Sequence, residues 1–267
     1  MDYFVTGNAA KKAIKASLIE INGVRAQSNS RVKANDELQF LEDLRTSPKP
    51  YTIDFDILFE DEHLAVVNKP AGIMVSGNAY RTMQNAIIGK LKNSTEEDAL
   101  HWPKPVHRLD EATSGCLLFA KTKNAQLHLS KQFEERQTKK EYHAIVIGDI
   151  SKEGTISTSI DDKKSLTHYM VLKQFVTAKY GAVSLLFLRP ITGRKHQLRI
   201  HLSGIGTPIM GDKLYSTNTI NNYFEKGLFL CSTSLSFIHP KLNKTIKIET
   251  ALPRKFNKYL NRLEQLY

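Results

Sequence analysis

The sequence is poor in cysteine and contains no long apolar run. Its 267 residues include two cysteines, Cys116 and Cys231, which are too few and too far apart for a disulfide framework or a paired zinc motif. No stretch of about 18 consecutive apolar residues occurs, so no transmembrane helix is predicted. Residues 1–6 do not begin a basic stretch followed by an apolar one, so no secretory leader is predicted. We therefore expect a cytoplasmic protein with reduced thiols and no membrane partner.

The sequence also lacks the usual motifs for nucleotides, hydrolytic serines and metals. The glycines within residues 204–211 do not have the spacing of a dinucleotide fingerprint, and no GxxxxGK[ST] loop occurs. No GxSxG motif surrounds Ser114. Neither an HExxH motif nor a paired cysteine accompanies His107, His196 and His201, so structural hydrogen bonds or phosphate contacts are expected of these histidines. Neither a metal nor a nucleotide cofactor is predicted.

Acidic residues are the minority among the charged residues. Lys and Arg number 38 against 27 Asp and Glu, which gives a formal net charge of +11. An excess of positive charge favours a polyanionic partner, most often nucleic acid. The hydrophobic content of 41% is ordinary for a globular chain that forms one large core and a small additional unit.

Residues 107–116 read HRLDEATSGC and form the most informative segment of the chain. They place the carboxylate of Asp110 near Arg108 and before a Thr-Ser-Gly turn that leads into an apolar strand. A carboxylate that is aimed by a turn and held by a strand suits a nucleophile or a general base. On this segment alone, the alternative is an aspartate that only caps its own turn.

A second segment, residues 189–212, reads RPITGRKHQLRIHLSGIGTPIMGD. Three shorter segments occur in order along the chain: VNKPAGI at 67–73, KEYHA at 140–144 and LSFIHP at 235–240. Together with the Asp110 segment they closely resemble the ribosomal-large-subunit type A family of RNA pseudouridine synthases. The match covers roughly residues 55–255, and five ordered motifs argue strongly against chance, although any one alone would be weak.

The resemblance implies that the protein isomerises uridine in RNA to pseudouridine. The bond from ribose to nitrogen 1 of uracil breaks and carbon 5 joins the ribose, without a redox change or a group donor, so no cofactor is expected. Asp110 occupies the position of the family's catalytic carboxylate, and Arg199 that of the arginine that pairs with it. Tyr142 matches the aromatic residue that stacks on the flipped base or moves a proton at carbon 5, and Leu198 matches a residue of the pocket wall. From the residues alone, a structural ion pair for Arg199 and core packing for Tyr142 and Leu198 stay open.

Four further residues are candidates for substrate binding. Arg108 stands two residues before Asp110 and is placed to fill the gap that a flipped-out uridine leaves, with a local carboxylate or turn contact as the alternative. His107, next to Arg108, is a weaker candidate for a contact with the RNA. Lys69 and Arg194 are predicted to contact phosphates, which position RNA without reading its sequence.

The expected fold class is α+β with a mixed, largely antiparallel sheet in the catalytic domain. Short apolar strands dominate and do not show the regular strand–helix repeat of a doubly wound sheet. The resemblance implies the same architecture, the pseudouridine synthase fold. Helices are expected over residues 82–91, 124–136 and 192–203, and Thr192 is the expected cap of the last one.

Two domains and a linker are predicted. Residues 1–45 resemble part of a small RNA-binding domain that is truncated here, so RNA binding and a packing role are both open. Residues 46–52 form a polar linker that contains prolines, and residues 53–267 form the catalytic domain.

The rival interpretation is an RNA-binding or ribosome-assembly protein on the same fold whose catalysis is lost or secondary. Intact Asp110, Tyr142 and Arg199 argue against it. Departures from the family pattern, at Ser76 and at the pair 231–232, are expected to lie away from the chemistry. The resemblance implies ribosomal RNA or transfer RNA as the target. The choice between them stays open, because structured RNA is selected largely by shape and not by a readable side-chain code. A monomer is expected.

Overall fold

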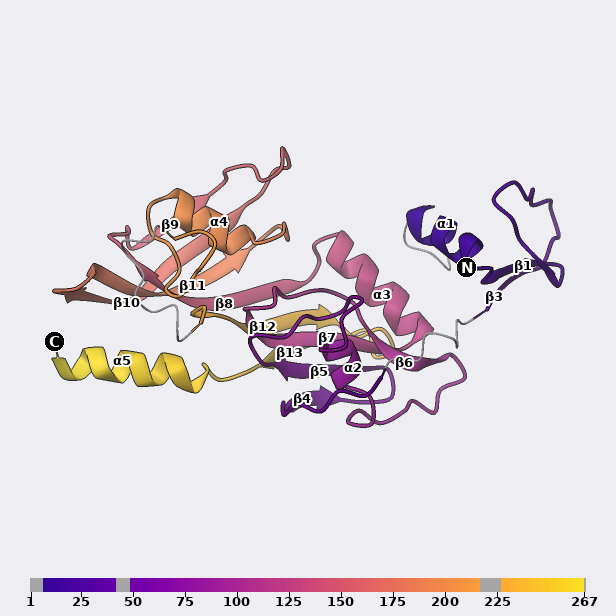
Figure 1. The fold of residues 1–267 in the computed structure, drawn as a ribbon, viewed down its shortest axis with the longest axis horizontal. Coiled ribbons are helices and arrows are strands. Elements are labelled where there is room, and N and C mark those ends of the chain that lie inside the picture. The colour runs from indigo at the N-terminus through magenta and orange to yellow at the C-terminus, as the bar shows by residue number, and fades with distance from the viewer. Residues whose placement is uncertain (1–6, 42–48, 217–226, 267) are drawn as a thin grey trace. The chain divides into compact units, whose positions relative to one another are not determined.

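The computed structural model describes residues 7–41, 49–216 and 227–266 of the chain (Figure 1). The chain divides into two compact units, Met1–Lys49 and Pro50–Tyr267. Residues 46–48 of the predicted linker lie outside the described ranges. The predicted domain limits therefore stay a prediction, and each unit is described by itself.

Residues 7–41, the described part of the smaller unit, form one helix and a small antiparallel sheet. Its elements are α1 (Gly7–Lys15), β1 (Ile19–Ile21), β2 (Val24–Arg25) and β3 (Leu38–Phe40), and the strand order is β2-β1-β3. Asn22 and Gly23 join β1 to β2 with φ values of 51° and 77°. Positive φ at both central residues is the requirement of a tight hairpin turn, and the Asn-Gly pair meets it with little strain.

The larger unit is built on a 10-stranded sheet. Eight of its strands follow the order β4-β5-β7-β12-β8-β11-β10-β9, and the other two are β6, which pairs with β7, and β13, which pairs with β12. β7 and β12 run parallel, and the other paired strands run antiparallel. The predicted α+β class with a mixed, largely antiparallel sheet is confirmed. The strands are β4 (Ile57–Glu60), β5 (Leu64–Lys69), β6 (Ala99–Pro105), β7 (Ser114–Thr122), β8 (Lys139–Ile147), β9 (Glu153–Ile156), β10 (Thr167–Thr177), β11 (Gly181–Pro190), β12 (Leu230–Ile238) and β13 (Thr245–Glu249).

The helices of the larger unit are α2 (Met83–Ala86), α3 (Lys123–Glu134), α4 (Gln197–Gly204) and α5 (Arg254–Leu266). α3 begins one residue before the predicted start and ends two residues before the predicted end. The hydroxyl of its cap, Thr122, accepts the N–H of Ala125 at 3.1 Å. α2 is much shorter than the predicted helix over 82–91. None of the helices in the described ranges has both the length and the apolar character that a bilayer crossing requires.

The predicted cap of α4 was wrong. Thr192 does not cap the helix, because its hydroxyl donates to Oε1 of Gln197 at 2.7 Å and accepts the N–H of Leu166 at 3.0 Å. α4 begins five residues later, after His196, whose backbone is left-handed with φ 55° and ψ 21°. A left-handed histidine carries no sequence signal, so the pattern alone extended the helix too far.

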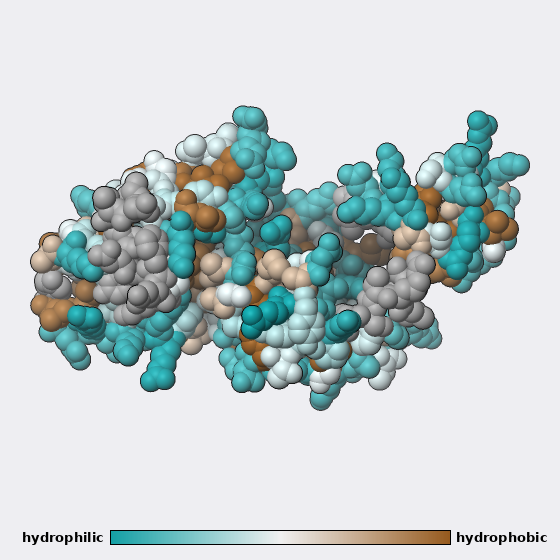
Figure 2. Space-filling view, in the orientation of Figure 1, coloured by the Kyte–Doolittle hydropathy of each residue, from teal (hydrophilic) through white to brown (hydrophobic). Residues whose placement is uncertain are grey.

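The core lies on both faces of the central strands. All nine residues of β7 are buried; Leu117 and Phe119 join the larger apolar cluster, whereas Leu118 and Ala120 join the smaller one. This alternation is the period of two that a strand covered on both faces requires. Hydrophilic residues cover most of the surface of this unit on the face shown in Figure 2, and hydrophobic residues form small patches there.

Candidate active site

The turn that carries Asp110 lies directly before β7. The carbonyl oxygen of Asp110 accepts the N–H of Thr113 at 3.0 Å, which closes the turn. Leu109 points into the core with 5% exposure, whereas Arg108 is exposed. The Asp110 side chain stays 18% exposed. The apolar anchor on one side and β7 on the other fix a carboxylate that is accessible to a ligand.

Lys69 supports this turn from inside and was wrongly predicted to contact phosphate. Its side chain is fully buried, and its ammonium donates to the carbonyl oxygens of Thr113 at 2.7 Å, Pro70 at 3.0 Å and Glu111 at 3.1 Å. Burial lowers the pKa of Lys69 to about 8, against the opposing charges of Asp110 and Glu111. A buried lysine cannot meet RNA, so its role is to hold the Asp110 turn.

The turn leads into the centre of the sheet, where β7, β12 and β8 lie side by side. Gly115 pairs with Ser232 of β12, and Ser232 pairs with Tyr142 of β8. A Cβ atom on Gly115 would lie 2.0 Å from the carbonyl oxygen of Ser232, and its φ is +113°. Only glycine permits this backbone approach. The close approach brings the Asp110 turn and Tyr142 to the same part of the sheet.

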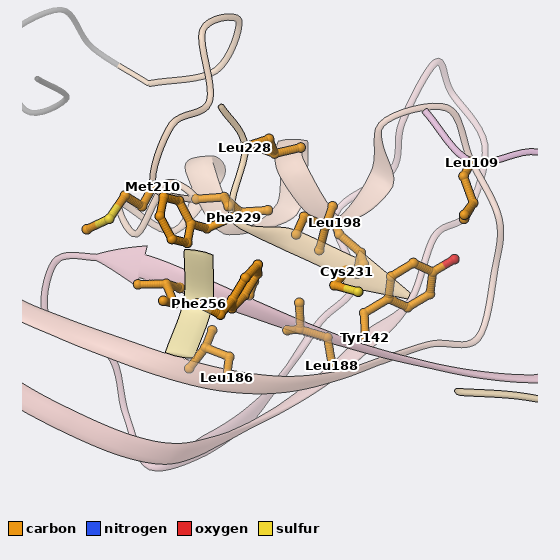
Figure 3. Close-up of a cluster of buried hydrophobic side chains, with 14 of the residues drawn as sticks. Leu109, Tyr142, Leu186, Leu188, Leu198, Met210, Leu228, Phe229, Cys231 and Phe256 are labelled. Atoms are coloured by element: carbon orange, nitrogen blue, oxygen red, sulfur yellow. The ribbon is translucent and has the colours of Figure 1, made fainter. Parts of the chain in front are cut away.

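Tyr142 is buried at this point, with 9% exposure. Its ring lies beside Cys231 and Leu198, with the hydroxyl on the side of Leu109 (Figure 3). Burial raises the pKa of Tyr142, a hydrogen bond with the Ser232 side chain opposes the rise, and the charge of Asp110 adds to it. The side chain therefore meets a ligand as a neutral hydroxyl on an apolar ring.

Ser232 corrects the expectation that the family departure at 231–232 lies away from the chemistry. Ser232 stands opposite Tyr142 in the register, and its side chain opposes the rise in the pKa of the Tyr142 hydroxyl. The register of β12 shifts between Ser232 and Ser234, as a bulge does. Bulges are common next to active sites because they re-aim side chains.

Arg199 does not make its predicted partnership with Asp110. Its Nε donates to Oδ2 of Asp212 and its Nη2 to Oδ1 of Asp212, both at 2.7 Å. The exposed fractions of Arg199 and Asp212 are 5% and 1%. Burial alone would lower the pKa of Arg199, but Asp212, and to a smaller extent Asp110, raise it. Asp110 thus feels Arg199 as a nearby charge, while a bidentate pair with Asp212 fixes the guanidinium.

His196 is the residue that approaches Asp110, and the sequence did not indicate this. Its Nε2 lies 3.7 Å from Oδ1 of Asp110, and its Nδ1 lies 2.9 Å from the hydroxyl of Tyr215. Burial lowers the pKa of His196, the charge of Asp110 opposes this, and Arg199 and Lys195 support it. The imidazole is therefore neutral near pH 7, and it lies between the carboxylate of Asp110 and the hydroxyl of Tyr215.

His107 and His201, the other two histidines considered as metal ligands or phosphate contacts, are structural. Of the two expectations for His107, the structural hydrogen bond is confirmed and the contact with RNA was wrong: its Nε2 accepts the N–H of Leu118 at 3.0 Å and its ring stacks on Phe133 at 4.6 Å. Burial lowers its pKa to about 3, so the ring carries no positive charge for RNA. His201 is 1% exposed. No group of three or more His, Cys, Asp or Glu suited to a metal occurs within residues 7–41, 49–216 and 227–266.

The remaining cations lie around the site. Arg108 is exposed, and Arg194 is half-buried with its Nε donating to the carbonyl oxygen of Lys164 at 3.3 Å. Lys140 stands two residues before Tyr142 on the same face of β8 and was not singled out from the sequence. Burial and the charge of Arg136 lower the pKa of Lys140. The substrate contacts of Arg108 and Arg194 stay predictions.

The assembled site has a directed carboxylate, a fixed cation, a neutral tyrosine and an apolar wall. Leu198 belongs to that wall, since it is 7% exposed and lies in the cluster that includes Tyr142. A carboxylate in this setting suits nucleophilic or electrostatic work on a planar ring held against Tyr142. The residues missed from the sequence, Asp212 and His196, lie inside the second motif, where the letters do not tell which side chain faces which.

Comparison with known proteins shows the family to which the chain belongs. The model of the RNA pseudouridylate synthase family matches residues 63–204. The chain is 30% identical to ribosomal large subunit pseudouridine synthase C of Rickettsia prowazekii, over 95% of this chain and 91% of the relative. It is 35% identical to the dual-specificity RNA pseudouridine synthase RluA of Vibrio vulnificus, over 70% of this chain and 78% of the relative.

A solved structure, human RNA pseudouridylate synthase domain containing 4, superimposes with a TM-score of 0.62 at 27% identity, over 78% of this chain and 92% of that one. The fold and the site define an isomerase that acts on RNA. The chain belongs to the RNA pseudouridine synthases of the RluA family. The predicted family, fold class and enzyme class are confirmed.

Proposed function

We propose that Asp110 is the catalytic carboxylate that converts specific uridines of structured RNA to pseudouridine. Its fixed but accessible position beside Tyr142 and the charge of Arg199 is the observation that carries the proposal. Asp110 acts as nucleophile or electrostatic stabiliser on the flipped nucleotide. Tyr142 stacks on the detached uracil and takes part in proton transfer at carbon 5. Arg199 supplies positive charge, and Leu198 closes the pocket.

Ribosomal RNA of the large subunit is the substrate class we propose. The relative from Rickettsia prowazekii, which aligns over nearly all of this chain, is named for that subunit. The relative from Vibrio vulnificus is named for dual specificity, which makes transfer RNA the second candidate. Arg108 and Arg194 contact the RNA in this proposal, the first at the position that the uridine leaves.

We also propose that the enzyme works as a monomer in a reducing compartment, the cytoplasm. Cys116 and Cys231 are both free and buried, and burial raises the pKa of each thiol, which favours the inert protonated form. Light scattering on the protein as it elutes from a size-exclusion column tests whether it is a monomer, and localisation of a tagged chain tests the compartment.

The described part of Met1–Lys49, with its small sheet, is a second contact for RNA in this proposal. Deletion of this unit, followed by measurement of RNA affinity, tests the contact.

Tritium release from RNA labelled at carbon 5 of uridine tests the activity and the target together. Wild-type protein and the Asp110→Asn variant are compared on separate ribosomal and transfer RNA fractions. Release by the wild type alone, and from the ribosomal fraction, is the expected result. Release from transfer RNA alone would replace the proposed target, and equal release by Asp110→Asn would remove Asp110 from the chemistry. No release by folded protein that still binds RNA would favour the binding or assembly function.

A further inference from the structure

His196 is held in a costly backbone conformation at the start of α4. Its φ of 55° and ψ of 21° lie in the left-handed region, which is unfavourable for residues with a Cβ atom. It stands at the cap position of the helix, yet its side chain makes no capping hydrogen bond. Such strain persists where the surrounding structure requires it, and it gathers at functional sites.

The side chain lies between two groups instead of capping the helix. On one side, Nε2 lies 3.7 Å from Oδ1 of Asp110. On the other, Nδ1 lies 2.9 Å from the hydroxyl of Tyr215, with the ring centroids 5.7 Å apart. The imidazole therefore bridges the catalytic turn and the segment after Asp212.

Tyr215 is itself fixed by the buried ion pair. Its backbone N–H donates to Oδ1 of Asp212 at 3.2 Å, and its backbone carbonyl accepts the hydroxyl of Ser203 from α4. The guanidinium of Arg199 lies 5.1 Å from the centre of its ring. The phenol thus has a defined position relative to α4, and it can order the imidazole.

The two contacts together select one tautomer of the neutral imidazole. If the Tyr215 hydroxyl donates to Nδ1, the ring proton resides on Nε2 and points toward the carboxylate. In the other tautomer, the lone pair of Nε2 would face the negative oxygen of Asp110, which is repulsive. We infer that His196, set by Tyr215 as its Nε2–H tautomer, is a positioning residue that orients the Asp110 carboxylate for attack.

The contact tightens when the substrate is bound. At 3.7 Å the two atoms lie beyond the usual range of an N–H···O hydrogen bond, about 2.7–3.2 Å. Catalytic hydrogen bonds are often long before the substrate binds and shorten in the complex. The inference rests on the proposed role of Asp110, and it adds that Asp212 acts on Asp110 through Tyr215 and His196.

The first test is the nitrogen-15 NMR signature of the His196 ring, measured at neutral pH without RNA. The expected spectrum has the proton on Nε2 in the wild type, and a mixture of tautomers in Tyr215→Phe. A wild-type ring protonated only on Nδ1 would overturn the inference. This measurement does not depend on activity, so it remains informative if the proposed function fails.

The second test separates positioning from binding. His196→Asn keeps a residue that tolerates the left-handed conformation but cannot reach Asp110, and we expect kcat to fall by about tenfold or more with KM for RNA nearly unchanged. His196→Gln, whose amide N–H extends toward the same place, should regain part of the loss. The exposed His168, on β10, gives the matched control His168→Asn with wild-type kcat. Wild-type kcat in His196→Asn, or an equal defect in both glutamine and asparagine variants, would contradict the positioning role.

Discussion

The guanidinium of Arg199 binds Asp212 and not Asp110, through two hydrogen bonds of 2.7 Å. The pair is almost wholly withdrawn from water, so each partner depends on the other for its charge. Asp212 also accepts the N–H groups of Leu214 and Tyr215, at 2.9 and 3.2 Å. One buried carboxylate therefore fixes both the cation beside the catalytic turn and the loop that carries Tyr215.

Asp212→Asn should be strongly destabilising for this reason. The amide is the same size but leaves the Arg199 cation without its counter-charge, and we expect the free energy of unfolding to fall by about 3 kcal/mol. Urea unfolding of the purified variant measures the change. The exposed pair of Glu264 with Lys173 provides the control, since Glu264→Gln should cost less than about 1 kcal/mol. Equal losses in the two variants would show that the buried Arg199–Asp212 pair contributes no more to the free energy of unfolding than the exposed pair.

Lys69→Met should loosen the Asp110 turn. Methionine keeps much of the side-chain volume but leaves the carbonyls of Glu111 and Thr113 without their buried donor. We expect a loss of about 1–3 kcal/mol in the free energy of unfolding, and a fall in kcat at temperatures where the variant is still folded. Lys123→Met, at an exposed lysine that opens α3, is the control. Unchanged kcat in folded Lys69→Met would show that the Asp110 turn keeps its geometry without the hydrogen bonds of the Lys69 ammonium.

The central strands were predictable because a strand that is buried on both faces has a continuous run of apolar residues in the sequence. The apolar strand that was expected directly after Asp110 and its turn is β7. The role of Lys69 was not predictable, because a lysine before a proline reads as an exposed loop residue. Its burial depends on a turn 42 to 44 residues further along the chain, which only the tertiary structure brings to it.

The pattern identified the members of the site better than their partners. Asp110, Tyr142, Leu198 and Arg199 are gathered in one part of the larger unit, as the motifs suggested. The partner of Arg199 was mistaken because a charge can be satisfied by any carboxylate that the fold brings near. The start of α4 was also mistaken, since the helix begins after the left-handed residue His196, five residues after Thr192.

His107 predicts a specific dependence of stability on pH. Its ordinary pKa of 6.5 is lowered to about 3 in the folded protein by burial. Below pH 6.5 the unfolded chain binds a proton that the folded chain refuses, so the stability from this group is lost as the pH falls toward 3. Between pH 7 and pH 5 the loss from this one residue is about 2 kcal/mol.

His107→Gln should remove that part of the pH dependence. The glutamine amide oxygen can accept the N–H of Leu118 but does not titrate. Denaturant unfolding at pH 7 and pH 5 should therefore give a smaller difference for this variant than for the wild type. His128→Gln, at an exposed histidine of α3, should keep the wild-type difference. If His107→Gln also keeps it, protonation elsewhere governs the acid sensitivity.

Gly115→Ala tests the close approach of β7 to β12. The added methyl group would lie 2.0 Å from the carbonyl oxygen of Ser232, and backbone atoms cannot move away as a flexible side chain can. We expect the two strands to separate locally, with a loss of stability and of activity, because the shift displaces both the Asp110 turn and Ser232. Gly204→Ala, where no atom lies within 4 Å of the added group, is the matched control in a calorimetric unfolding scan. A melting temperature equal to that of the control would contradict the steric argument.

Lys140→Met should weaken RNA binding through lost charge. Lys140 lies on the face of β8 that carries Tyr142, and a Cβ atom on Gly193 would lie 3.6 Å from its ammonium, so it borders the second motif. The charge of Arg136 opposes its protonation, and a phosphate group would relieve that repulsion. Binding titrations at several salt concentrations should show lower affinity and a slope of log K against log salt reduced by about 1. Lys139→Met, an exposed neighbour on the opposite face of the strand, should leave the slope nearer to the wild-type value. Equal slopes for the two variants would mean that net charge matters and the place of Lys140 does not.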